Sequence, residues 1–194
     1  ALPFKLLGGF VKLLRKETCT AARALEFTIL VVARTSEVLN AKWCEIDMDE
    51  KIWIIPAYRM KSGKEHRIPL NERAIQLLEE MKKIKSNDYI FPGMKLGRPL
   101  SNMSMLAVLK RLERSDLTTH GFRSTFRDWA GESTAYPREV IEHALAHQLK
   151  DKAEAAYARG TLFDKRKRLM ADWANYCNTI QHTGSVTLIR EKTV

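Results

Sequence analysis

Basic side chains and one tyrosine gather at five places in this chain, with a spacing that folding alone does not explain. His120 and Arg123 stand three residues apart, so both project from one face of a helix and can hold one ligand together. A guanidinium such as that of Arg34 binds the oxygens of an anion through a fixed fork of donors. These residue types therefore suit the binding and conversion of an anionic group. In chain order, the candidate residues are Arg34, Lys61, His120, Arg123, His147 and Tyr157.

The charge balance of the chain also favours an anionic partner. Among 194 residues, 33 are Lys or Arg and 23 are Asp or Glu, which gives a net charge of +10 and a pI near 9.6. A basic excess of this size favours nucleic acid, because each neutralised phosphate releases condensed counterions. On charge alone, a ribosomal-type or merely basic protein fits equally well. The chain length and the 45% hydrophobic content fit one globular domain with a core of its own.

The elements that must position the candidate residues are mainly helical. Apolar residues recur at helical spacing. Ser36 is a candidate cap for a short helix through Leu39, with the acid Glu37 in its first turn. Glu37 is expected either to cap this helix or to orient Arg34. The remaining predicted helices cover 4–14, 21–32, 101–113, 120–131, 137–145, 151–158 and 164–180.

One β-rich stretch interrupts the helices. The string KIWIIPAYRMKSGKEHRIPL predicts a strand, a turn at Ser62-Gly63 and a second strand that ends at Pro69. Lys61 then lies at the turn. Asn71 is the expected cap of the next helix, whose inward face carries Ala74, Ile75, Leu77, Leu78 and Met81. The predicted fold class is therefore mainly α with a small antiparallel β-hairpin or sheet (α+β).

The ordered candidate residues resemble the signature of the tyrosine recombinase (phage integrase) family. The strings RMKSGKEHRIPL, THGFRSTFRDWA and LAHQLKDKAEAAYARG are most similar to the integrases of prophages and genomic islands. An H-x-x-R pair alone occurs by chance in many proteins, but five pieces in this order are a specific signal. The resemblance covers roughly residues 15–180. It implies the catalytic-domain fold of that family over 1–182, followed by a C-terminal tail over 183–194.

The resemblance also implies a reaction, in which DNA is cut and rejoined through a 3′-phosphotyrosyl bond. Tyr157 is then the nucleophile, and the two arginines stabilise the negative charge that gathers on the phosphate. By resemblance, His120 assists proton transfer from the tyrosine, and Lys61 protonates the departing 5′ oxygen. His147 matches a position that donates a hydrogen bond to the phosphate. Since the covalent bond stores the energy, no ATP, metal or other cofactor is expected, and the sequence contains no G-x-x-x-x-G-K-[ST] loop.

Several alternatives remain open at the level of single residues. Lys64 competes with Lys61 for the role of general acid, and Arg34 alone fits a simple surface pair with Glu37. His143 and His147 form an H-x-x-x-H pair that suits zinc on one helical face, although the HExxH glutamate is missing. The basic run 164–168 fits a solvated face as well as a phosphate contact. Rival tyrosines are Tyr58, Tyr89, Tyr136 and Tyr176.

The alternative functions are a non-catalytic DNA-binding relative, a type IB topoisomerase-like enzyme and a metal hydrolase built on the two histidines. For the integrase, the implied partners are double-stranded DNA at attachment sites and accessory excision and DNA-bending proteins. A homotetramer forms on DNA, and the isolated domain is expected to be a monomer. The apolar stretch 186–189 of the tail is a candidate contact with a neighbouring subunit.

The cellular setting is expected to be the bacterial cytoplasm, at the nucleoid. The three cysteines Cys19, Cys44 and Cys177 are widely spaced and suggest no disulfide framework, which favours a reducing compartment. No apolar run approaches the ~20 residues of a membrane span. The chain does not begin with Met, so we expect a fragment whose upstream DNA-binding domains are absent.

Overall fold

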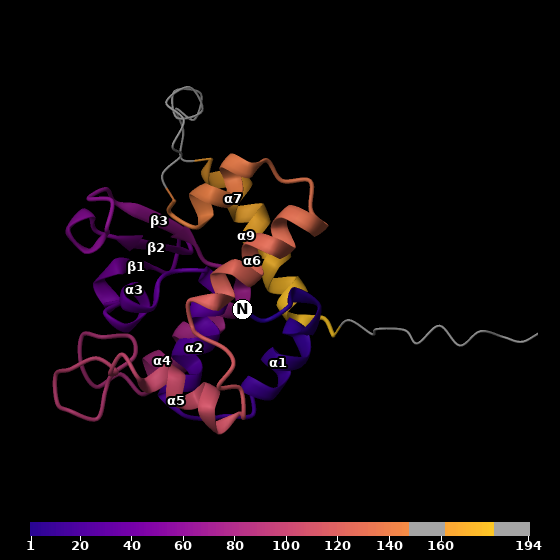
Figure 1. Cartoon of the computed structure of the whole chain (residues 1–194). Helices are drawn as coiled ribbons and strands as arrows, with labels where there is room; N and C mark the ends of the chain where they lie inside the picture. The colour runs from indigo at the N-terminus through magenta and orange to yellow at the C-terminus, as the bar shows by residue number, and fades with distance from the viewer. Residues whose placement is uncertain (148–161, 181–194) are drawn as a thin grey trace, which may run out of the picture.

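The computed structural model describes residues 1–147 and 162–180, in which helices surround one small antiparallel sheet (Figure 1). This architecture confirms the predicted fold class. The strands are β1 (Ile46–Asp47), β2 (Ile52–Ile55) and β3 (His66–Pro69). The helices are α1 (Leu7–Leu14), α2 (Thr20–Val31), α3 (Thr35–Leu39), α4 (Glu72–Lys83), α5 (Ser104–Arg111), α6 (Gly121–Ser133), α7 (Arg138–Ala144) and α9 (Phe163–Asn178).

Helix α2 is the centre of the helical core, because it packs against α1, α3, α4, α5 and α9. All eight residues from Ala24 to Val31 are buried, including the acid Glu26. Arg15 and Arg73 donate to the Glu26 carboxylate at 2.6 Å and 2.9 Å. A buried charge is tolerated when it is paired and hydrogen-bonded in this way. The end of α2 is consequently a fixed point from which the chain enters α3.

The three strands pair in the order β1-β2-β3, and all neighbours are antiparallel. Ile55 pairs with His66 at the turn end of the predicted hairpin, and the side chains of Trp53 and Ile55 are both buried. Gly63 adopts a φ of +65°, which suits the predicted turn because glycine reaches this region without strain. The hairpin and its turn were predicted correctly. Strand β1 was not predicted, because two residues are too few to display an alternating pattern.

The helical predictions hold in type and differ at their ends. Asn71 caps α4 as predicted, since its side chain accepts a hydrogen bond from the Ala74 amide at 3.0 Å. The predicted cap at Ser36 is wrong: α3 begins at Thr35, and Arg34 occupies the cap position. The predicted helix 101–113 is shortened to Ser104–Arg111. The predicted helix 151–158 and the tail 183–194 lie outside the described residues.

In Figure 1, the sheet and α3 lie together on one side, while α6, α7 and α9 form the opposite layer. The site described below lies where the ends of α2 and α7 meet the starts of α3 and α6. Across the described residues, no helix is long and apolar enough to cross a membrane.

Candidate active site

Arg34 is held in place by the first turn of α3. The Glu37 carboxylate accepts from the Arg34 backbone amide at 2.8 Å and from its guanidinium Nη1 at 2.8 Å. Arg34 Nη2 donates to the carbonyl oxygen of Ala146 at 3.2 Å. Glu37 therefore both caps α3 and orients Arg34, as expected. The Ala146 contact means that the simple surface pair is an incomplete description of this arginine.

Arg123 lies in the first turn of α6 with only 5% of its surface exposed. Its guanidinium donates to the carbonyl oxygen of Val32, and to that of Leu145 at 2.6 Å. Burial and the nearby charge of Arg34 lower the pKa of Arg123 to about 10, so the group stays cationic at neutral pH. Because both carbonyls are neutral, they orient this guanidinium without cancelling its charge. Among the described residues, Arg123 Nε has no hydrogen-bond partner.

His147 is joined to Arg123 and to a buried acid. Arg123 Nη2 lies 3.2 Å from His147 Nε2, and Glu142 Oε2 lies 2.6 Å from His147 Nδ1. A guanidinium can only donate, so this geometry fits a ring that carries its proton on Nδ1 and accepts at Nε2. Glu142 also accepts from Arg127 Nε at 2.8 Å. Burial disfavours its ionisation, but hydrogen bonds from His147 and Arg127 outweigh that effect and lower the pKa of Glu142.

His120 stands at the cap position of α6, at the edge of the same cluster. Partial burial and the charges of Arg123, Arg34 and His147 lower its pKa. The imidazole is therefore biased toward the neutral form, which is the form that can accept a proton.

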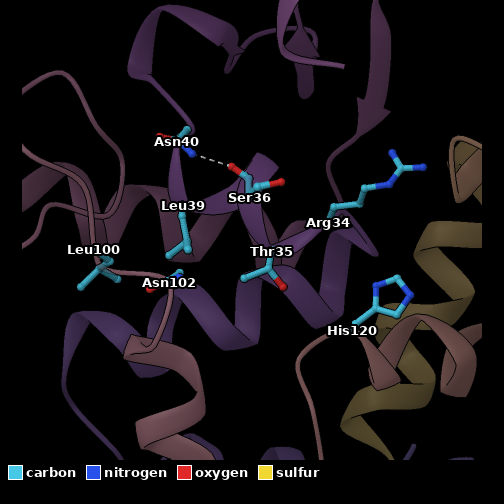
Figure 2. Close-up of a pocket in the computed structure, with 8 residues that line it drawn as sticks. All are labelled: Arg34, Thr35, Ser36, Leu39, Asn40, Leu100, Asn102 and His120. Atoms are coloured by element: carbon cyan, nitrogen blue, oxygen red, sulfur yellow. Dashed lines mark hydrogen bonds between the residues drawn. The ribbon is translucent and has the colours of Figure 1, made fainter. Parts of the chain in front are cut away.

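A surface pocket of about 440 Å³ opens beside these residues. Figure 2 shows the Arg34 and His120 side chains together at one end of the pocket, with Asn40 and Leu100 at the other. Its lining residues are Arg34, Thr35, Ser36, Leu39, Asn40, Leu100, Asn102 and His120. The arrangement can bind an anion at the Arg34 guanidinium and place it next to the His120 imidazole, whose lowered pKa favours the neutral form.

The structure thus brings together four of the six predicted residues: Arg34, His120, Arg123 and His147. Lys61 lies at the exposed hairpin turn, as does its competitor Lys64. No contact from either lysine to the other four is observed in the described part of the chain. Tyr157 lies outside the described residues, so its position stays a prediction.

The zinc alternative loses its geometric basis. Helix α7 ends at Ala144, and Ala146 has a φ of +49°, so His143 and His147 do not share a helical face. His147 Nδ1 is also engaged by Glu142. Across residues 1–147 and 162–180, no group of three or more His, Cys, Asp or Glu residues is placed to hold a metal ion.

Sequence reasoning missed three groups around the site. Glu142 precedes His147 by five residues, and an acid that directly follows the apolar pair Val140-Ile141 was an available signal. His66 opens β3; burial and the charges of Arg166, Arg34, Arg123 and His143 lower its pKa to about 3.

The third group is Arg166, which lies in the basic run 164–168. This run is not a uniformly solvated face, because Arg166 is buried while its basic neighbours are exposed. Arg166 is buried and donates to the carbonyl oxygen of Arg67 in β3 at 2.8 Å, which ties α9 to the sheet. Burial lowers the pKa of Arg166 to about 10. Its neighbours Lys165, Lys167 and Arg168 are exposed.

Two solved structures have the same fold. A lambda integrase dimer bound to a COC′ core site matches with a TM-score of 0.57 and 18% identity, over 76% of this chain and 57% of that one. A lambda integrase tetramer bound to a Holliday junction matches with a TM-score of 0.54 and 17% identity, over 78% of this chain and 45% of that one. At this level of identity the likeness establishes the fold alone.

Sequence comparison identifies the family. The model of the phage integrase family matches residues 9–161, and the chain belongs to that family. Prophage integrase IntA of Escherichia coli K12 is 35% identical over 163 residues, which are 82% of this chain and 39% of that protein. The integrase of Enterobacteria phage P4 is 30% identical over 171 residues, or 79% of this chain and 39% of that protein. The chain thus spans about two fifths of the length of these relatives.

Proposed function

We propose that this chain is the catalytic domain of a site-specific DNA recombinase of the integrase type. The observation that carries the proposal is the cluster of Arg34, Arg123, His120 and His147, of which Arg34 and His120 line one pocket. Two guanidiniums in fixed orientation match the nonbridging oxygens of a phosphodiester, whose transition state gathers negative charge. The substrate is double-stranded DNA, and the product is the integrated or excised form of a prophage or genomic island.

The reaction follows from the residues in hand. The phenol oxygen of Tyr157 attacks phosphorus, the bond to the 5′ oxygen breaks, and a 3′-phosphotyrosyl bond forms. The phenol proton passes to His120, and the departing 5′ oxygen takes a proton from Lys61. Rejoining is the reverse attack by a 5′ hydroxyl, so the phosphodiester energy is conserved and no ATP is consumed. His147 donates a hydrogen bond to the phosphate in the form that carries a proton on both ring nitrogens, with Nδ1–H bound to Glu142 and Nε2–H directed at the DNA.

The other tyrosines offer weaker nucleophiles. The Tyr136 hydroxyl donates to Asp172 at 2.7 Å, and burial together with this acid raises its pKa to about 12. The Tyr176 hydroxyl donates to the Phe4 carbonyl at 3.3 Å. Tyr58 and Tyr89 line a separate pocket from that of Arg34 and His120, beside Lys42 and Arg59. This elimination supports Tyr157 as the nucleophile.

The proposal extends to the assembly and its setting. Residues 1–182 form the catalytic domain, and a full-length protein carries further DNA-binding domains. Recombination exchanges four strands, so we infer a homotetramer on two DNA duplexes, in line with the tetrameric lambda integrase on a Holliday junction. The isolated domain is a monomer, and accessory excision and DNA-bending proteins assist in the bacterial cytoplasm.

The test is covalent capture. The full-length protein is incubated with nicked attachment-site DNA, and a DNA adduct that maps to Tyr157 is expected. Tyr157→Phe should abolish the adduct while DNA affinity is kept, since the ring remains. An adduct formed by the Phe variant would refute the assignment, and loss of cleavage in EDTA would revive the metal hydrolase. Relaxation of supercoiled plasmid without site preference would favour the topoisomerase-like alternative, and binding without any adduct would favour the non-catalytic relative.

A further inference from the structure

A second pocket continues the first one along α3. It encloses about 320 Å³ and is lined by Ser36, Asn40, Lys42, Tyr58, Arg59 and Tyr89. Ser36 and Asn40 also line the pocket of Arg34 and His120, so the two pockets meet across this face of α3. We call these two adjoining pockets together the α3 trough. It leads from the candidate active site to the segment that precedes the hairpin turn.

The α3 trough has a one-sided charge. Of the described residues that line it, none is acidic, whereas Arg34, Lys42 and Arg59 are cationic. Glu37 and Glu45 lie behind its floor and are buried, bound to Arg34 and Arg59. By contrast, the pocket on α6 and α7 is lined by both signs of charge, including Asp128, Glu132 and Arg138. Unlike that pocket, the trough has the uniformly positive lining that suits a polyanion.

The floor of the trough is preorganised. Arg59 donates to the carbonyl oxygen of Glu37 at 2.6 Å and to the Glu45 carboxylate. Glu45 also accepts from the Lys42 backbone amide at 3.2 Å. These contacts fix the positions from which the Lys42 side chain and the rim residue Tyr58 project.

Two side chains on the rim of the trough remain available to a ligand. The Lys42 ammonium stands 5.6 Å from the centre of the Tyr89 ring, and in the described part of the chain it makes no ion pair. Tyr58 is 83% exposed. An exposed aromatic ring next to a cationic group without an ion pair is a common arrangement for backbone contact and base stacking on nucleic acid.

We propose that the α3 trough binds the DNA strand that continues from the phosphate held by Arg34 and Arg123, with Lys42 paired to a flanking phosphate and Tyr58 against the adjoining sugar or base. This inference rests on the proposed function. From Ser36 to Asn40, α3 rises ~6 Å, and phosphates of one strand follow every ~3.4 Å along the duplex axis. With α3 laid along the strand, this rise spans about two phosphates, so the proposal places Lys42 at the second or third phosphate from the cleaved one.

The first experiment measures salt dependence. Binding of the full-length Tyr157→Phe protein to its site is titrated from 50 to 200 mM salt, with and without Lys42→Gln. Loss of one phosphate contact lowers the slope of log K against log salt by ~0.9, so the affinity lost over this range becomes about 3-fold smaller. The matched control is Lys12→Gln, an exposed lysine on α1 that lines neither pocket. Equal slopes for Lys42→Gln and wild type would overturn the proposal.

The second experiment locates the contact. Single methylphosphonate substitutions neutralise each phosphate near the cleavage point in turn. Neutralising one position, the second or third phosphate from the cleaved one, should lower the DNA affinity of the protein that has Lys42. The same substitution should leave the DNA affinity of Lys42→Gln unchanged. Equal sensitivity of both proteins at every position would refute the contact. The proposed function has a separate test: it fails if the protein with Tyr157 intact forms no covalent adduct. The salt slopes show whether Lys42 contacts a phosphate, whatever the outcome of that test.

Discussion

Replacing Glu142 by glutamine should slow DNA cleavage, although this side chain does not face the pocket. The two carboxylate oxygens of Glu142 accept from two different donors, His147 Nδ1 and Arg127 Nε. A glutamine has one oxygen and one NH2 group, so it must turn a donor toward one of these two partners. Either His147 loses the acceptor that fixes its tautomer, or Arg127 loses its partner.

The magnitude follows from the geometry of the contact. The 2.6 Å contact to His147 is short, and Glu142 is only 7% exposed. A hydrogen bond to a charged group contributes about 1.5–3 kcal/mol, which corresponds to a ~10–150-fold change in rate if the bond acts fully in the transition state. Groups that orient a catalytic histidine from behind commonly have effects of ~10–100-fold.

The assay is single-turnover formation of the tyrosine adduct on nicked attachment-site DNA. Glu139→Gln is the matched control, because Glu139 lies on the same helix and is exposed. Denaturant unfolding of both variants separates a slower reaction from a weaker fold. Glu139→Gln should form the adduct at the wild-type rate. If Glu142→Gln also forms it at the wild-type rate, Glu142 does not position His147 for the reaction.

Two further predictions concern pH. His120 acts as the proton acceptor in its neutral form and has a lowered pKa, so the adduct rate should hold through pH 6.5 and fall only at more acidic pH; a rate already half-lost at pH 6.5 would contradict this. His66 has a pKa of about 3 in the folded chain, so the unfolded chain takes up its proton first and stability falls as the pH drops below 6.5. Between pH 6.5 and pH 5, urea unfolding of the wild type should lose roughly 1.5 kcal/mol more than His66→Gln, whereas equal losses would rule out a buried neutral His66.

The sequence predicts those parts of the fold that depend on near neighbours. Asn71 and Ala74 are three residues apart, and the turn at Gly63 is a local conformation, so both were visible in the pattern. The start of α3 was misplaced because Ser36 is the better capping residue by type. In the folded chain Glu37 supplies the missing acceptor to the Arg34 amide, which moves the start to Thr35.

The candidate site was predictable from residue order and not from contacts. Arg34, His120, Arg123 and His147 were recognised through the family signature, and the fold brings them together. The residues that interact with this cluster could not be predicted from the sequence. For example, His66 lies far in the chain from Arg123 and Arg166, whose charges together with that of Arg34 lower its pKa. Periodicity carries no information on contacts between residues so far apart in the chain.

The contacts of Arg123 have a consequence for how relatives of this protein evolve. Its guanidinium joins the carbonyl oxygen of Val32, after α2, to that of Leu145, after α7. A descendant that abandons catalysis would still need this clasp between two distant segments. Selection for folding alone therefore retains Arg123, and its presence in a related sequence says little about whether that sequence still cuts DNA. The exposed imidazole of His120 makes no such link among the described residues, so its loss is the earlier sign of a lineage that has given up the reaction.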